Sequence, residues 1–259
     1  MGALRASGGA SEELIRQTHQ GLRRLPDGGA VGSSVVTSLA PVVTSLDAVF
    51  TGRLQPLGPK GLPSGILKTP VSGMVQIGVT GIEGDEQGDR RVHGGPEKAV
   101  HYYPAASYAT LAAHRPELAP VLVPGSLGEN LSGGLTEADV CIGDVYRVGT
   151  AELEVSQLRR PCWKIEARFE AEGLIEVVNR TGCTGWYFRV RTPGECGVGD
   201  EVDLLERPSP GLTLARYHAA EMNQDAEAAE LRLLAVAPAL NKNWASRLLA
   251  RAEFLESAE

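Results

Sequence analysis

Long apolar runs and paired cysteines are both missing from this chain of 259 residues. A helix that spans a bilayer needs about 18 or more apolar residues in a row, so we expect no transmembrane helix. The four cysteines include no C-x-x-C pair, which argues against a structural zinc site. Their even number would allow two disulfides, but no other feature indicates secretion. A reducing cytoplasm is the simpler interpretation.

The chain also has no excess of basic residues, since its formal net charge is −7. Nucleic-acid binding usually needs a basic face, so we expect neither nucleic acid nor a membrane as partner. Binding of a small anion depends instead on local charge. Such charge is concentrated in two clusters, which are Arg90, Arg91 and Lys98, and Arg159, Arg160 and Lys164.

Three parts of the chain differ in composition. Residues 1–44 are rich in glycine, serine and alanine and offer too little apolar surface to offset their ordering entropy, which predicts a flexible N-terminal arm. Residues 45–206 hold many short alternating runs broken by glycine and proline, which favours a β barrel or sandwich. Examples of these runs are 75–79, 144–148 and 200–205. From residue 209 the composition turns to alanine, leucine and glutamate, which is typical of helices.

Apolar residues at helical spacing predict where the helices lie. One is expected over residues 104–114. The segment 163–180 predicts two short helices divided at Gly173, since glycine interrupts helical patterns. The C-terminal part predicts three more, over residues 212–222, 225–236 and 243–255. Helices this short are marginal alone, so they are expected to pack on the barrel or on a partner.

The cysteine with the most suggestive surroundings is Cys162. It follows an alternating run, residues 151–157, and therefore lies just past the end of a predicted strand. Nearby cations favour the thiolate, the form that attacks electrophiles and binds metals. Strand alternation predicts that Arg159 points inward and that Arg160 is solvated. The alternative interpretation is a half-buried structural cysteine, because most cysteines are simply buried.

The turn His93-Gly94-Gly95-Pro96 predicts an anion site. Two glycines let backbone N–H groups approach an anion closely and form a nest. Cations and donors expected to assist are Lys68, Arg90, His93 and Lys98. The alternative is a tight structural turn with a surface histidine.

Asn130 offers a donor and an acceptor to a bound ring, and Glu129 could position a cation. Either residue could equally satisfy its own loop backbone. We interpret His101, Tyr102 and Tyr103 as packing groups. The remaining cysteines and Trp244 are expected in the interior.

Four segments, in this order, resemble the MOSC domain, the family named after the C-terminal domain of molybdenum-cofactor sulfurases. They are residues 65–71, 90–104, 125–131 and 157–164. The resemblance spans residues 46–255 and is closest to a bacterial subfamily that is associated with resistance to N-hydroxylated purines. It implies an α+β fold that is mainly β. A MOSC-type β barrel with short helical insertions would fill residues 45–206, and a small α-helical domain of three helices would fill residues 209–259.

The resemblance also implies a cofactor and the residues that hold it. The matching cysteine of the family is a ligand of molybdenum, so Cys162 would be both the metal ligand and the catalytic residue. A soft thiolate suits a redox metal that dithiolene sulfurs already hold. The residues expected to bind the molybdenum cofactor (molybdopterin) are Lys68, Arg90, His93, Gly94, Gly95, Lys98, Asn130 and Arg159.

The leading hypothesis is an oxidoreductase that reduces N-hydroxylated compounds of the hydroxylaminopurine type, which is a detoxification. No flavin, haem or iron–sulfur motif is visible, so a separate electron-donor redox protein is an expected partner. The alternatives are a non-catalytic carrier of the cofactor, a carrier of a persulfide on Cys162, and a thiol that senses peroxide. The pyridoxal-phosphate domain of the full sulfurase would not fit in a chain of this length. A homodimer through the helical tail is a further expectation.

Overall fold

The structure, a computed structural model, describes residues 44–258, apart from the side chains of Arg90, Arg91 and Ala258. The predicted N-terminal arm lies outside the described residues, except for Thr44. Within residues 44–258, no helix is both long and apolar enough to cross a membrane.

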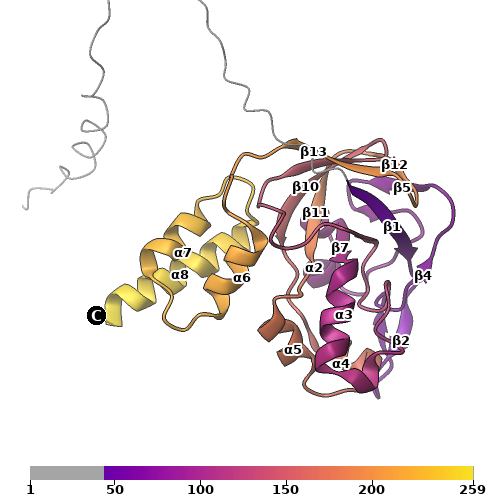
Figure 1. Ribbon diagram of the computed structural model, residues 1–259, viewed down its shortest axis with the longest axis horizontal. Coiled ribbons are helices and arrows are strands. Elements are labelled where there is room, and N and C mark those ends of the chain that lie inside the picture. The colour runs from indigo at the N-terminus through magenta and orange to yellow at the C-terminus, as the bar shows by residue number, and fades with distance from the viewer. Residues whose placement is uncertain (1–43, 259) are drawn as a thin grey trace, which may run out of the picture. The chain divides into compact units, whose positions relative to one another are not determined.

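Seven strands close into a barrel (Figure 1). Their order around the barrel is β13-β9-β10-β11-β7-β8-β1, and pairing of β1 with β13 closes the ring. Neighbours are antiparallel except β7 and β8, which are parallel. The barrel confirms the predicted α+β fold. Its strands are β1 (Thr44–Thr51), β7 (Val100–Pro104), β8 (Leu131–Gly133), β9 (Val145–Val148), β10 (Ala151–Leu158), β11 (Trp186–Thr192) and β13 (Glu201–Glu206).

Shorter strands pair outside the closed ring. The predicted strand at residues 75–79 is β5 (Val75–Gly78), which lies in a small sheet between β12 (Gly194–Cys196) and β6 (Gly81–Ile82). A hairpin joins β2 (Gln55–Leu57) to β3 (Leu62–Ser64), and β4 (Thr69–Pro70) pairs with the end of β1.

Alternation along β10 shows how the sequence fills the barrel. Ala151, Leu153 and Val155 are fully buried, whereas the two glutamates that alternate with them, Glu152 and Glu154, are only half-buried. Tyr102 and Trp186 oppose each other on neighbouring strands, and their rings stack with centroids 4.5 Å apart. Such aromatic pairs stabilise a sheet beyond the area they bury. The end of β10 is therefore a firm support for the segment that follows it.

Helical insertions lie between the barrel strands. The predicted helix at 104–114 is α3, and the segment 163–180 forms α4 and α5 with Gly173 between them, in the left-handed conformation (φ 79°). Figure 1 shows α3, α4 and α5 gathered together. Their apolar faces share one buried cluster, which contains Leu111, Ile165 and Val178. These elements are α2 (Arg90–His93), the 3₁₀ turn η2 (Pro96–Lys98), α3 (Ala105–His114), the 3₁₀ turn η3 (Pro116–Leu118), α4 (Trp163–Phe169) and α5 (Leu174–Thr181).

The C-terminal segment forms α6 (Leu214–Met222), α7 (Ala228–Ala235) and α8 (Lys242–Ala258), where the spacing predicts helices. Tyr217, Leu234 and Trp244 from these helices belong to the same buried apolar cluster as Val155 of the barrel. The helices therefore pack on the barrel. Their standing as a separate domain over residues 209–259 stays a prediction.

Candidate active site

Cys162 lies in the short link between the end of β10 and the first residue of α4. Its carbonyl oxygen accepts a hydrogen bond from Ile165 N at 3.0 Å, and its side chain is half-exposed. All four cysteines are free thiols, and the other three are buried. Burial raises the pKa of the Cys141 thiol and raises the pKa of the Cys196 thiol to about 12. Those two remain protonated and inert, so Cys162 is the thiol that a ligand or substrate can reach.

Two hollows meet at Cys162. Including the open space at their mouths, the first hollow has a volume of about 610 Å³ and the second about 1440 Å³. Of the predicted site residues, Lys68, Asn130 and Arg159 line the first hollow, whereas Gly94 and Gly95 line the second. The residues common to both walls are His93, Lys98, Arg160, Cys162 and Tyr187.

The structure thus divides the predicted set into two groups on either side of Cys162. The anion nest predicted at Gly94 and Gly95 faces the second hollow, away from Lys68 and Asn130. Gly95 has a positive φ of 83°, a conformation that favours glycine. Whether the turn binds a phosphate stays a prediction. The side chain of Arg90, the other cation expected here, lies outside the described residues.

The two arginines before Cys162 differ in burial. Arg159 is 6% exposed and donates from Nη2 to Leu127 O at 3.0 Å, while its Nη1 is buried with no partner among residues 44–258. Arg160 is exposed and lies 3.4 Å from the Glu221 carboxylate. The inward Arg159 that strand alternation predicts is present. It brings a permanent positive charge to the wall of the first hollow.

Lys68 carries a charge that a neighbouring carboxylate balances. Its ammonium group forms an ion pair with Asp85, and both side chains are almost fully buried, at 5% and 2% exposed. Asp85 also accepts a hydrogen bond from Gly52 N at 2.8 Å. Sequence reasoning missed Asp85, because only the folded chain brings it beside Lys68. This pair fixes the wall of the first hollow and lowers the net charge that Lys68 contributes.

The sequence indicates that His101 is a packing group, and in the structure it also lines the candidate site. The residue is buried in β7, but its ring also lines the first hollow, and Nε2 has no partner within the described part of the chain. Burial, aided by the charge of Arg159, holds the pKa of His101 well below its usual value, so the ring is neutral. Strand alternation offered the signal: His101 faces away from Tyr102, whose ring fills the barrel core.

Asn130 joins two strands by its side-chain amide. Its Oδ1 accepts from His101 N at 3.1 Å, and its Nδ2 donates to Phe50 O at 3.3 Å. Glu129 is fully buried, accepts from Tyr108 Oη and Gly125 N at 2.5 Å each, and has its pKa raised by burial. Glu129 thus binds the backbone of its own loop, at Gly125, which is the alternative that the sequence left open. The amide of Asn130 instead bonds the backbone of two distant strands. Asn130 still lines the hollow.

His93 and Lys98 stand where the hollows meet. Burial, with the charges of Lys164, Lys98 and Arg159, lowers the pKa of His93 to about 4. Burial also lowers the pKa of Lys98, whose Nζ donates to Val92 O at 2.5 Å and lies 5.8 Å from the centre of the Tyr187 ring. His93 is therefore a neutral imidazole in a strongly positive field. A site of this kind favours an anionic or acceptor-rich ligand.

Comparison with known proteins identifies the family. The family model of the MOSC domain matches residues 89–203. Protein YiiM of Escherichia coli is 36% identical over 76% of this chain and 87% of its own length. The crystal structure of YiiM from Geobacillus stearothermophilus superposes with a TM-score of 0.68 at 29% identity and covers 81% of this chain and 99% of that chain. A Gibberella moniliformis protein named Reductase is 37% identical over 69% of this chain, which matches 32% of that longer protein.

The chain belongs to the MOSC domain family, as the four sequence segments predicted. The segments that carried the resemblance converge in space: residues from each of them line the first hollow, namely Gly65, His93, Gly128 and Cys162.

Proposed function

We propose that this chain is an oxidoreductase that binds the molybdenum cofactor and reduces N-hydroxylated compounds, hydroxylaminopurines among them. The observation that carries the proposal is the position of Cys162, a reachable thiol at the junction of two hollows and beside Lys98, Arg159 and Lys164. One soft thiolate can be the only protein ligand of a metal that other sulfur atoms already hold. Membership of the MOSC family and the name of the fungal relative support this class of activity.

The first hollow fits an acceptor-rich organic cofactor. Arg159 Nη1 and His101 Nε2 are buried polar atoms that lack partners among the described residues, and both side chains line this hollow. Buried polar atoms in folded proteins almost always have partners, so a bound pterin would complete these two. Within residues 44–258, no group of three or more His, Cys, Asp or Glu side chains is placed to hold a metal. Cys162 would therefore anchor a metal whose other ligands come with the cofactor.

The reaction consumes two electrons and two protons: R–NH–OH + 2 e⁻ + 2 H⁺ gives R–NH₂ + H₂O. The bound cofactor would supply the two-electron redox chemistry. The chain's own residues would bind the substrate, orient it and supply protons to it. Lys98 Nζ is the acid on the wall of both hollows, and its lowered pKa favours proton donation. Neutral His93 would donate a hydrogen bond to the substrate oxygen from the same wall.

The electrons would come from a separate redox protein. The free thiols at all four cysteine positions favour a reducing compartment, and we place the protein in the cytoplasm.

The test is reduction of an N-hydroxylaminopurine by protein purified from a host that makes the cofactor, with chemically reduced methyl viologen as electron donor. Wild type should release the aminopurine, and Cys162→Ser should not. Cys183→Ser is the matched control, because Cys183 is buried away from both hollows. Protein that binds molybdenum but reduces no hydroxylamine would support a cofactor carrier instead, and protein without molybdenum would favour a persulfide at the same thiol.

A further inference from the structure

We propose that the second hollow binds the organic part of the substrate, a flat, uncharged nitrogen heterocycle, and that Gln157 determines its specificity. This inference rests on the proposed function, because it assigns the cofactor to the first hollow and the substrate to the second. Cys162 lines both hollows, so a metal held there would face a molecule bound in either one.

The two hollows differ in the chemistry of their walls. Lys68, Arg159 and Lys164 line the first hollow and are absent from the second. The second hollow instead presents four side-chain amides: Gln157, Asn179, Asn241 and Asn243. Each amide carries both donors and an acceptor, and this combination matches the ring nitrogens and amino groups at the edge of a heterocycle such as a purine. An anion would gain more in the first hollow.

Gln157 is held in place by an irregularity in β10. The register between β10 and β11 shifts between Val155 and Gln157, which leaves Ser156 as an extra residue, and such bulges redirect the side chains beside them. Ser156 secures the bulge: its hydroxyl donates to Glu97 O at 2.6 Å and lies 3.0 Å from Tyr187 O, and its carbonyl accepts from Asn241 N at 3.0 Å. The bulge thus places Gln157 on the wall of the second hollow.

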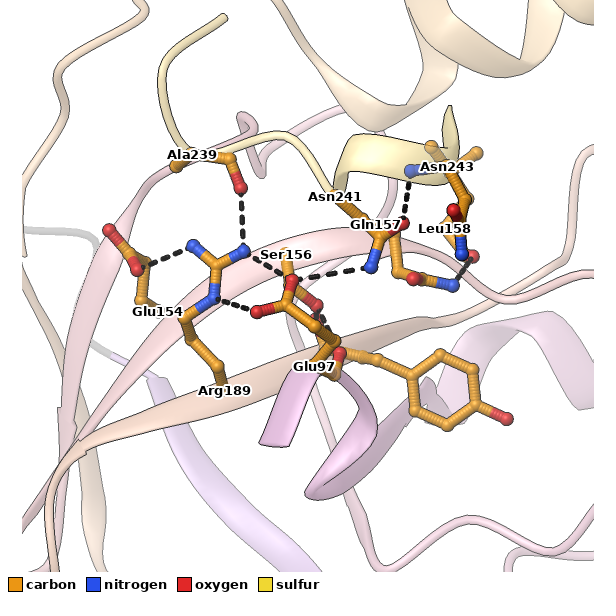
Figure 2. Close-up of polar contacts among 10 residues, drawn as sticks. Glu97, Glu154, Ser156, Gln157, Leu158, Arg189, Ala239, Asn241 and Asn243 are labelled. Atoms are coloured by element: carbon orange, nitrogen blue, oxygen red, sulfur yellow. Dashed lines mark hydrogen bonds and ion pairs between the residues drawn. The ribbon is translucent and has the colours of Figure 1, made fainter. Parts of the chain in front are cut away.

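The amide of Gln157 has unused capacity. The residue is only 4% exposed, and the one hydrogen bond from its side-chain amide to the described residues is long, from Nε2 to Leu158 O at 3.4 Å. The amide oxygen and a second N–H donor are therefore available to a ligand in the hollow. Figure 2 shows Gln157 among the side chains that secure this wall.

The far wall of the hollow holds two arginines that share one carboxylate partner. The guanidinium of Arg247 lies 5.6 Å from the centre of the Trp244 ring. Glu221 accepts from Arg247 at 2.6 Å and lies 3.4 Å from Arg160, so one carboxylate tethers both arginines. Guanidinium groups and aromatic rings are surfaces against which heterocyclic bases pack. The shared carboxylate balances one of the two positive charges and so weakens the attraction of this wall for an anion.

A network around Arg189 holds the two sides of the hollow together (Figure 2). Arg189 donates to both carboxylate oxygens of Glu97, at 3.1 and 2.5 Å, to Glu154 at 2.8 Å and to Ala239 O at 2.9 Å. Asn241 Nδ2 also donates to Glu97, at 3.3 Å. Glu97 follows the glycine turn, and Asn241 directly precedes α8, so Arg189 is a positioning residue for both walls.

The experiment measures binding and turnover separately. Calorimetry gives the dissociation constant of an N-hydroxylaminopurine, and steady-state assays give kcat/KM for that compound and for N-methylhydroxylamine, which lacks the ring. Gln157→Met keeps the volume and removes the amide. We expect it to weaken purine binding about tenfold, because a paired amide contact is worth that much discrimination. Molybdenum content and kcat/KM for N-methylhydroxylamine should not change. Gln76→Met, an exposed glutamine outside both hollows, is the matched control.

Three results would overturn the inference. They are unchanged purine binding by Gln157→Met, equal losses for both substrates, and competition between inorganic pyrophosphate and the purine, which would assign the second hollow to the cofactor's phosphate end. If Gln157→Met does not fold, Asn243→Ala at the exposed rim carries the same expectation. Purine binding is measured without turnover. The binding result for Gln157→Met can therefore be read even if the protein does not reduce hydroxylamines.

Discussion

The buried ion pair between Lys68 and Asp85 allows a quantitative prediction. Exposed ion pairs contribute about 0–1 kcal/mol to stability, but breaking a buried pair costs about 3–5 kcal/mol, because the remaining charge is left without compensation. With side chains 5% and 2% exposed, this pair belongs to the second class. We therefore expect Lys68→Met, and separately Asp85→Asn, to lower the free energy of unfolding by about 3–5 kcal/mol each.

The double variant Lys68→Met/Asp85→Asn distinguishes the lost charge balance from other damage. It leaves no buried charge at this point, and asparagine keeps an acceptor for Gly52 N. Its cost should therefore fall well below the sum of the single costs, with a coupling energy of about 2 kcal/mol or more. Urea-induced unfolding of the wild type, the two single variants and the double variant gives the four free energies from which the coupling energy is calculated. Costs below about 1 kcal/mol for both single variants, or simple additivity, would refute the reasoning.

Three further predictions concern other parts of the fold. The folded-state pKa of His93 lies near 4, below the unfolded value of 6.5, so its contribution to stability is complete above about pH 6.5 and is lost as the pH falls toward 4. NMR titration should give this pKa, and His93→Asn should reduce the loss of stability between pH 6.5 and pH 4. A measured pKa near 6.5 would contradict this prediction. Gly128→Ala, at φ 86° and with a new Cβ only 2.8 Å from an isoleucine side chain, should lower the melting temperature more than Gly84→Ala, which has a φ of 84° but no neighbour within 4 Å; equal shifts would exclude the clash. Asp144 is fully buried and accepts from Arg207 at 2.9 and 2.7 Å, so Asp144→Ala should cost about 3–5 kcal/mol in urea unfolding, and less than 1 kcal/mol would be inconsistent with a buried pair.

The local elements of this fold could be predicted from the sequence because their causes are local. Alternation placed β10 and turned Arg159 inward, and Gly173 marked the break between α4 and α5. Closure of the barrel could not be predicted in this way. It depends on the parallel pairing of β7 with β8 and on the contact of β1 with β13, whose strands lie far apart in the sequence.

The candidate site shows the same division. Cys162 and its cations were visible because they are neighbours in the chain. Asp85 was missed, because its role depends on the approach of Lys68 in the folded protein. Trp244 was expected only in the interior; it is buried, but it also lines the second hollow. The wall of the second hollow combines residues of the barrel with residues at the start of α8, and neither segment alone has a sequence pattern that predicts this contact.

The central claim is that Cys162 anchors molybdenum, and metal content tests it most directly. Wild type, Cys162→Ser and Cys183→Ser are purified in parallel from a host that makes the cofactor, and molybdenum per chain is measured by mass spectrometry. We predict near-stoichiometric metal in wild type and in Cys183→Ser, and a large loss in Cys162→Ser. Equal molybdenum in all three proteins, or none in wild type loaded with cofactor, would contradict the account.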